Sequence, residues 1–527
     1  MKKLLFAVAL MVTGEVFSQQ QNIELPDFVI TGRQSADVQA SQKPKPELIS
    51  ILSQEFFTPQ YSPEELPLLL SSEPVSILPD IKTSNEVFSG NLNVKVGKYT
   101  LPIGELNLSK SYENYLFSAK LWGVNTTEYI PNSGYNNSGF NMIHDFFTST
   151  RADFLPGSKI SVDATYWRDS YKMFCSANPA QIRESNNGNA QFKFSNNYNR
   201  FLNSEFGISA NYLSLNENNL SEFTIKGNGL LEFKMDYFSL GADADYSIQK
   251  FKSDLFPSDS FSSLMGEGYL SANISNSLQL KGGIVFHTGG NSDLFSPFGS
   301  LRFQFAKGFL LGFEYKPRVA FLTNRNILDQ NLYSSVGTIP NCFTKYNTSF
   351  TGSLTYEFQK TFLVNLSFNY SKADNFIYYD DITNAGIFDI LVLNDAGLIN
   401  GKLTLQYHPG DLGTFYGEFS YQDDTDANGF AIPYHPKMNS MIYYSYDFNF
   451  GLGVKVGYES CMDVYTNRLN TNQLEDYHNI FASVSFELIH GIKITGDFQN
   501  ILNRSNFVWK GYQRKPFDYL VGIDYRW

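Results

Sequence analysis

From about residue 88 to its last residue, the chain alternates between apolar and polar positions in stretches of about ten residues. Clear examples are 92–96, 160–166, 364–370 and 482–488. Successive side chains of a β-strand point to opposite faces, so this period of two predicts strands with one apolar and one polar face. Soluble sandwiches alternate in the same way, but about ten residues is also the length of a tilted strand that crosses a membrane. The apolar set is rich in Phe, Tyr, Leu and Val, which favours a membrane barrel.

Short and long connections between the predicted strands alternate along the same region. Short polar links occur near 155–157, 197–199, 306–308, 359–360, 408–410 and 490–491. Longer ones occur near 124–137, 173–187, 251–261, 321–346, 373–396, 423–437, 460–476 and 502–515. Short periplasmic turns and long external loops are typical of outer-membrane barrels. The pattern predicts an all-β fold, a transmembrane antiparallel β-barrel of about 22 strands over residues 88–527, with both barrel ends on the short-turn side.

The N-terminus has the features of a secretory signal peptide. Lys2 and Lys3 precede an apolar run at 4–12, and small residues follow at Val16 and Ser18. We expect a signal peptide at 1–18 and export to the cell outer membrane. After this run no apolar stretch reaches the length of about 18 residues that a membrane helix needs. Residues 19–87 hold eight of the 20 prolines, which predicts a short, largely extended periplasmic segment with little core of its own.

Composition supports a barrel and excludes several classes of function. Aromatic residues make up 16% of the chain and charged residues only 17%, which suits strands between lipid and water with aromatic girdles at both interfaces. The net charge is −12 and no run of Lys or Arg stands out, so we expect no nucleic-acid partner. The three cysteines have no metal-type spacing and predict neither a zinc site nor a disulfide framework. We expect no cofactor.

The last strand ends on an aromatic residue. One face of it carries Tyr519, Val521, Ile523, Tyr525 and Trp527. This pattern resembles the assembly signal that the barrel-assembly machinery binds, which makes that machinery and outer-membrane lipid expected partners. Just before it, 500–504 reads Asn-Ile-Leu-Asn-Arg, followed by Gly511-Tyr512 and Pro516. This ordered set resembles the end of TonB-dependent receptor barrels, although Ile501 stands where that family usually has Leu. Residues 90–110 are similar to the opening hairpin of the same barrels.

A second resemblance lies near the N-terminus. The run 23–33 is similar to the TonB-box region, a short β-prone stretch that ends here in Thr-Gly-Arg. The resemblance implies that this run would pair as an extra β-strand with TonB, or with another periplasmic or outer-membrane protein, through backbone hydrogen bonds. The implied strand residues are Phe28, Val29, Ile30, Thr31, Gly32 and Arg33. A plain extended tether is the alternative.

The chain departs from the TonB-dependent receptors in its plug. Receptors of that family carry a plug domain between the box and the barrel, whereas only about 55 residues, rich in proline, separate residue 33 from residue 88 here. A complete plug does not fit in this space. The lumen of a barrel of about 22 strands is wide, so we expect inward-folded loops, the N-terminal segment or another chain to fill it.

Few positions suggest site chemistry. Asp424, Asp426 and Asn428 match the first half of a calcium loop, but His435 stands where the bidentate acid of position twelve belongs, so a polar external loop is favoured over a metal site. The six histidines are scattered, and no nucleophile elbow, zinc-protease helix or phosphate loop occurs, so we expect no enzyme. Aromatic residues in and beside the long loops suit stacking on a glycan or other ligand, or simple girdle and loop packing; they include Tyr129, Tyr135, Phe256, Tyr333, Tyr378, Tyr379 and Tyr434.

The sequence therefore predicts a transport or channel protein that resembles a TonB-dependent receptor barrel without a plug. A scaffold or accessory subunit of an outer-membrane complex, with no transport role, is the alternative. The sequence does not identify a substrate.

Overall fold

The structure is a computed structural model that describes residues 89–527, apart from 256–258, 291 and 337–342. The predicted signal peptide at 1–18, the segment 19–87 and the TonB-box-like run at 23–33 lie outside the described residues. Everything that follows concerns the barrel. Within the described residues, no helix has the length and apolar character that a membrane crossing requires.

The described chain is built from long antiparallel strands. The first half of the barrel contains β1 (Gly90–Gly97), β2 (Thr100–Tyr112), β3 (Tyr115–Thr126), β4 (Tyr135–Phe147), β5 (Ser158–Lys172), β6 (Ile182–Asn196), β7 (Leu202–Leu215), β8 (Ser221–Lys234), β9 (Phe238–Lys252), β10 (Asp259–Ser275), β11 (Leu278–Thr288) and β12 (Leu294–Ala306). The second half contains β13 (Phe309–Tyr315), β14 (Arg318–Phe321), β15 (Phe343–Phe358), β16 (Phe362–Asp374), β19 (Ala396–Tyr407), β20 (Thr414–Gln422), β21 (Met438–Asp447), β22 (Leu452–Met462), β23 (Tyr477–Ile489), β24 (Ile492–Gln499) and β27 (Asp518–Arg526).

Short elements occur within the connections. They are the helix α2 (Asn324–Gln330), the 3-10 turns η2 (Glu217–Asn219) and η3 (Gly410–Leu412), and the strand pairs β17 (Phe376–Asp380) with β18 (Asp389–Leu393) and β25 (Phe507–Trp509) with β26 (Tyr512–Gln513).

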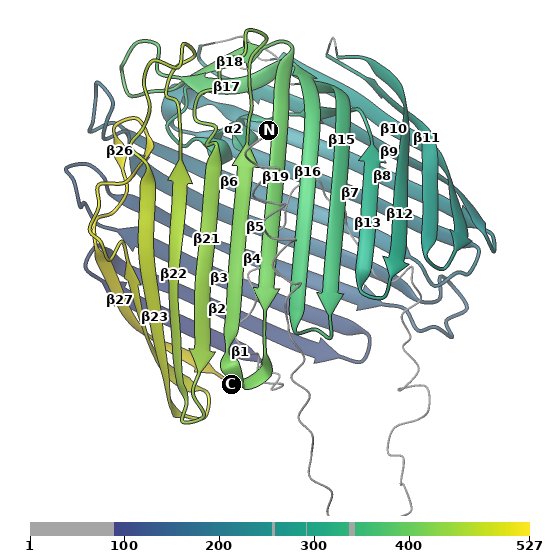
Figure 1. Ribbon diagram of the computed structural model, residues 1–527, viewed down its shortest axis with the longest axis horizontal. Helices are drawn as coiled ribbons and strands as arrows, with labels where there is room; N and C mark the ends of the chain where they lie inside the picture. Colours follow the sequence, from purple (N-terminus) through teal and green to yellow (C-terminus); the bar gives the residue numbers. More distant parts are fainter. Residues whose placement is uncertain (1–88, 256–258, 291, 337–342) are drawn as a thin grey trace, which may run out of the picture. The chain divides into compact units, whose positions relative to one another are not determined.

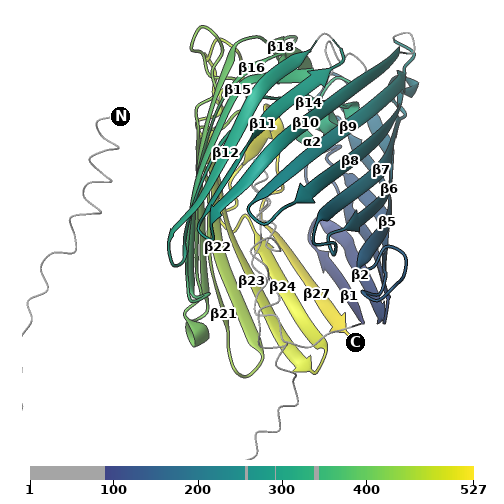
Figure 2. The same cartoon turned by 90° about the vertical axis from the view of Figure 1, so that its right-hand side faces the viewer.

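The sheet closes on itself between its first and last strands. β1 pairs antiparallel with β27 from Asn91 opposite Arg526 to Gly97 opposite Leu520, and the Trp527 carbonyl accepts the N–H groups of Ser89 and Gly90. β13 and β14 both pair with β15 and form one interrupted strand, so the ring contains 22 strands (Figures 1 and 2). This confirms the predicted fold class and strand count.

The two ends of the barrel differ as the sequence predicts. At one end, which we call the turn end, most connections are short, such as 276–277, 307–308 and 490–491, and both ends of the ring lie there. Gly308 and Gly491 each have a φ of 82° beside a β-bulge, a backbone conformation that glycine adopts without strain. The other end, which we call the loop end, carries the long connections 322–342, 375–395, 423–437, 463–476 and 500–517.

Alternation separates the two faces of the barrel wall. Side chains such as Val94 and Val521 lie on the outer face and are 40% and 48% exposed, although both are apolar. The lumen-facing set is polar and paired, as in Lys95 with Asp497 at 2.7 Å and Lys402 with Glu418 at 2.8 Å. An apolar exterior around a polar interior is the reverse of a soluble protein and defines a barrel that stands in the outer membrane.

Candidate functional site

Three loops from separate arcs of the ring meet over the lumen at the loop end. They are residues 322–336 between β14 and β15, residues 375–395 between β16 and β19, and residues 500–517 between β24 and β27. We call these three loops the cap. Both Figure 1 and Figure 2 place α2 and β18 at the loop end of the barrel.

Local sequence signals shape each loop of the cap. α2 begins with a capping box, in which Thr323 accepts the N–H of Asn326 and the Asn326 side chain returns to the Thr323 backbone. The loop 375–395 folds as a hairpin because β17 and β18 pair over five residues each, from Phe376 opposite Leu393. In the loop 500–517, the Asn500 side chain donates to the carbonyls of Arg504 and Lys515 and fixes the base.

An aromatic core holds the cap together. Its buried members come from all three loops: Ile327, Ile377, Tyr379, Phe388, Ile390 and Tyr512. The rings of Tyr333 and Tyr512 stack with centroids 3.5 Å apart, and the Tyr512 hydroxyl donates to the Gly386 carbonyl at 2.6 Å. Burying several large side chains stabilises this junction by about 1.5–3 kcal/mol each. The cap is therefore one packed body rather than three independent loops.

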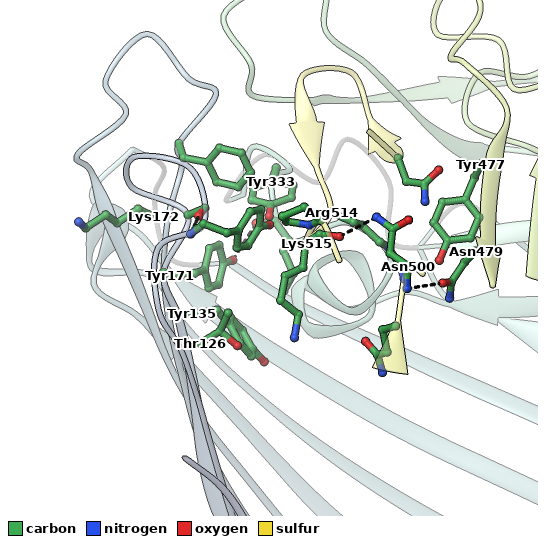
Figure 3. Close-up of a pocket in the computed structure, with 18 of the residues that line it drawn as sticks. Thr126, Tyr135, Tyr171, Lys172, Tyr333, Tyr477, Asn479, Asn500, Arg514 and Lys515 are labelled. Carbon is green, nitrogen blue, oxygen red and sulfur yellow. Dashed lines mark hydrogen bonds between the residues drawn. The ribbon is translucent and has the colours of Figure 1, made fainter. Parts of the chain in front are cut away.

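A pocket of about 410 Å³ lies beside the cap, between the strand ends of β3–β5, the loop 322–336, and the β23 and 500–517 side of the ring (Figure 3). Five tyrosines line it: Tyr129, Tyr135, Tyr171, Tyr333 and Tyr477. Polar groups complete the lining: Lys172, Glu459, Asn479, Gln499, Asn500, Asn506, Arg514 and Lys515. Aromatic faces together with a few convergent polar groups are typical of a ligand site.

The cations of the pocket differ in their partners. Lys172 pairs with Glu128 at 2.8 Å, and Lys515 pairs with Asp518 at 3.0 Å. Arg514 is exposed, and its guanidinium stands over the Tyr477 ring at 5.4 Å from the centroid. A guanidinium on an aromatic face keeps its N–H fork free for a planar anion. Arg514 is thus the cation of the pocket that is best placed to bind an anionic group.

The loop tyrosines of the pocket are neutral at physiological pH. Burial raises the pKa of Tyr129 to about 12, with Arg514 acting in the opposite direction, and burial likewise raises the pKa of Tyr333. The Tyr129 hydroxyl donates to the Gln513 carbonyl at 2.8 Å, which ties this loop to the cap. These phenols offer ring faces rather than charge to a ligand.

The loop aromatics predicted from the sequence fall into two groups. Tyr129, Tyr135 and Tyr333 line the pocket, whereas Tyr378, Tyr379 and Tyr434 pack within the loops. Phe256 lies outside the described residues. The sequence alone did not reveal Tyr171, Tyr477 and Arg514 as pocket residues, because strand-end tyrosines are common in this chain and an isolated Arg has no local signature. The residues that line the pocket are also far apart in the chain, from Thr126 to Pro516.

The residues of the calcium hypothesis have protein partners. Asp424 accepts hydrogen bonds from the Ile399 N–H at 3.2 Å and from the His435 imidazole at 2.7 Å. Asp426 accepts the N–H groups of Asn428 and Phe430. In the part of the chain that the structure describes, no cluster of three or more His, Cys, Asp or Glu side chains is arranged to hold a metal.

The face expected to carry the assembly signal lies outward on β27. Its side chains are each at least 40% exposed: Tyr519, Val521, Ile523, Tyr525 and Trp527. The Tyr525 and Trp527 rings stack with centroids 5.1 Å apart. Recognition of this face by the assembly machinery stays a prediction.

A closed ring of 22 strands with an apolar outer face, a capped loop end and a polar, tyrosine-lined pocket defines a large outer-membrane β-barrel. No family model matches the sequence, and no curated protein is similar to it. Solved structures are similar in fold. The copper transporter OprC has a TM-score of 0.64 and 11% identity over 85% of this chain and 82% of its own.

Two further structures agree with this fold. The FrpB iron transporter from Neisseria meningitidis has a TM-score of 0.65 and 10% identity over 84% of this chain and 82% of its own. The ferric enterobactin receptor PfeA from Pseudomonas aeruginosa has a TM-score of 0.62 and 10% identity over 85% of this chain and 81% of its own. At such identities the similarity shows the fold alone. The barrel has the fold of TonB-dependent receptors, which confirms the predicted resemblance.

Proposed function

We propose that this chain is an outer-membrane transport protein in which its own cap, rather than a separate plug domain, closes the barrel. The neighbours in fold are transporters and receptors rather than enzymes. The observation that carries the proposal is the meeting of three loops from separate arcs of the ring at Tyr333, Phe388 and Tyr512. A wide barrel must be sealed in either role, but a seal made of three loops packed as one body can move as a unit and open, which only a transport protein needs.

The pocket beside the cap is the proposed site of first contact with the transported solute. Its tyrosine faces and the Arg514 guanidinium suit a small solute with a flat or ring-shaped face and an anionic group. The Gln499 amide, which also lines the pocket, adds hydrogen-bonding groups for neutral polar atoms. By their descriptions the neighbours are a copper transporter, an iron transporter and a ferric enterobactin receptor. For this chain, the chemistry of the pocket suits anionic complexes or other anionic solutes.

The experiment is ion conductance in planar bilayers. We would compare the full chain with a variant in which the cap hairpin, residues 376–393, is replaced by a short Gly-Ser linker, each inserted at the same protein density. We expect discrete conductance steps from at least one of them, because a polar lumen that runs through the ring conducts ions once its obstruction moves. Bilayers that stay sealed with both proteins, while both run as folded heat-modifiable barrels on gels, would refute the transport function.

A further inference from the structure

One loop of the cap attaches it to the far wall of the barrel. We call residues 322–336 the strap. The strap leaves β14 and leads toward β15, but it contacts lumen-facing residues of β5, β6 and β8, which lie five to eight strands further round the ring of 22. Both figures of the whole barrel draw α2 inside the ring of strands. The strap therefore crosses the lumen.

The first anchor of the strap is Glu222 on β8. This carboxylate is only 3% exposed, and its Oε2 accepts the backbone N–H and the side-chain amide of Asn324, both at 2.8 Å. The Gln249 side chain donates to the same oxygen at 2.7 Å. Asn324 is the first residue of α2, so a negative charge stands where the free N–H groups of the helix begin. Charge-assisted bonds of this kind are about twice as strong as neutral ones.

The second anchor is Arg183 on β6, which has no exposed surface. Its Nη1 donates to the carbonyls of Leu332 and Ser334, both at 2.8 Å, while its Nε donates to Glu217 at 2.6 Å. The two carbonyls flank Tyr333, the strap residue that lines the pocket and stacks on Tyr512. One buried guanidinium thus holds the strap segment that also faces the pocket.

Weaker contacts lie between the two anchors. Arg325 donates to Asn187 at 2.7 Å and stacks over Trp167 at 4.7 Å from the ring centroid. Leu328 and Val336 pack against three leucines of the wall: Leu213, Leu215 and Leu220. The seam between strap and wall is therefore a small aliphatic cluster with charged hydrogen bonds on both sides.

The two attachments of the strap differ in what their separation costs. On the cap side, Tyr333 and Ile327 belong to or contact the aromatic core, whose opening would expose large apolar rings to water. On the wall side, separation would expose the aliphatic cluster around Leu328 and break the edge-on contacts that Tyr171 and Phe174 make with Tyr333. Water can replace the strap as the hydrogen-bonding partner of Glu222 and Arg183, which face the lumen. The core has more large rings packed among its own loops than across the seam to the wall, so the wall seam is the weaker of the two and the cap would leave the wall as one body.

We propose that the strap is a latch, held shut by Arg183 and Glu222, and that its detachment from β5–β8 opens the lumen. This inference rests on the proposed transport function. The opening lies on the β5–β8 side of the lumen, while the cap stays attached where its loops leave β14, β16 and β24 and where they enter β19 and β27. The contacts among the three loops of the cap persist during this movement, whereas those of Phe174 with Tyr333 and Tyr512 break.

The test measures exposure of a buried strap residue in the full chain. Leu328, which is 2% exposed, is changed to Cys in a background with Cys175, Cys342 and Cys461 changed to Ser, and its reaction with a water-soluble maleimide is timed. Arg183→Gln removes the anchor of two carbonyls and is expected to raise the labelling rate about tenfold.

The matched control is Lys402→Gln, which also removes a lumen-facing cation and takes the ion-pair partner from Glu418, but which lies on β19, away from the strap contacts with β5–β8. It is expected to leave the rate unchanged. Asn324→Ala removes a strap donor to Glu222 without altering the wall, so it decides the question if Arg183→Gln does not fold. It is expected to raise the rate severalfold.

Bilayer conductance of the same variants separates this inference from the proposed function. Faster labelling together with higher conductance in Arg183→Gln or Asn324→Ala supports both. Equal labelling rates in Arg183→Gln, Asn324→Ala and Lys402→Gln overturn the latch, whatever the conductance. Faster labelling with bilayers that remain sealed overturns the transport function and the opening step, while leaving a detachable strap.

Discussion

At the scale of single residues, the β17–β18 hairpin of the cap brings two like charges together. Asp380 and Asp389 stand directly opposite each other across this hairpin, and like charges in such a position repel. Burial raises the pKa of both carboxyls above the usual range, and the neighbouring Asp381 adds to the effect. The Asp381 side chain accepts the N–H groups of Ala385 and Gly386 in the turn between the strands.

These pKa shifts predict a hairpin that becomes more stable in mild acid. Because the folded state raises the pKa of Asp380 and Asp389, it binds protons more tightly than the unfolded chain. Stability is therefore gained as the pH falls through the raised pKa values, which lie above the ordinary value of about 4, and is lost as the pH rises through them. Hydrogen exchange of the β17 and β18 amides in wild type and in Asp389→Asn measures this at each pH.

The variant supplies its own control. Asp389→Asn removes one of the opposed charges, so its hairpin should be protected more strongly than wild type at neutral pH and about equally at low pH. A difference between the two proteins that stays constant with pH would contradict the assignment.

At the scale of elements, β27 closes the barrel. It pairs with β24 on one side and with β1 on the other, and the Trp527 ring occupies the space where Gly90 has no side chain. A Cβ on Gly90 would lie 2.2 Å from that ring. The seam of the ring thus depends on an aromatic end to the last strand and on a small residue at the start of the first.

We predict that Trp527→Ala lowers the amount of folded barrel in the outer membrane severalfold, because the proposed assembly face and the packing on Gly90 are both lost. The measurement is the fraction of heat-modifiable protein in outer-membrane preparations. Phe368→Ala, which removes an exposed ring of similar exposure from the middle of β16, is the matched control and should have little effect. Equal losses in the two variants would assign Trp527 to general lipid packing rather than to assembly.

At the scale of the whole molecule, the cap closes the lumen at the loop end, and transport requires a force that moves the cap. We propose that the run 23–33, and within it Phe28 to Arg33, adds as a strand to TonB on the periplasmic side. This segment lies outside the described residues, so the proposal rests on its resemblance to TonB boxes.

Deletion of residues 28–33 is predicted to abolish capture of the TonB C-terminal domain by the immobilised full chain in mild detergent. The control replaces 43–46, a Lys-Pro repeat of the same segment, with Gly and Ser, and should leave capture unchanged. Undiminished capture after the deletion would remove the TonB-box assignment without affecting the barrel or the cap.

The sequence by itself determined the architecture of the wall. A period of two repeated over hundreds of residues, with turn signals between the repeats, specifies strands, their two faces and their number, because each of these is a local property of consecutive positions. The aromatic terminus of β27 and the opening of β1 followed from short motifs at the chain ends. Boundaries were less accurate: the loop expected near 173–187 ends where β6 begins at Ile182.

Only the tertiary structure decided what closes the lumen and where a ligand would bind. In the sequence, Arg183 falls within the loop expected near 173–187 and Glu222 is an ordinary strand position, and neither has a neighbour that marks it as an anchor. Their role as anchors comes from hydrogen bonds to residues 324–334, more than a hundred positions away in the sequence, which the ring of strands brings across the lumen. The pocket likewise joins loops from opposite ends of the barrel sequence. Such contacts depend on the closure of the whole ring, which no local pattern encodes.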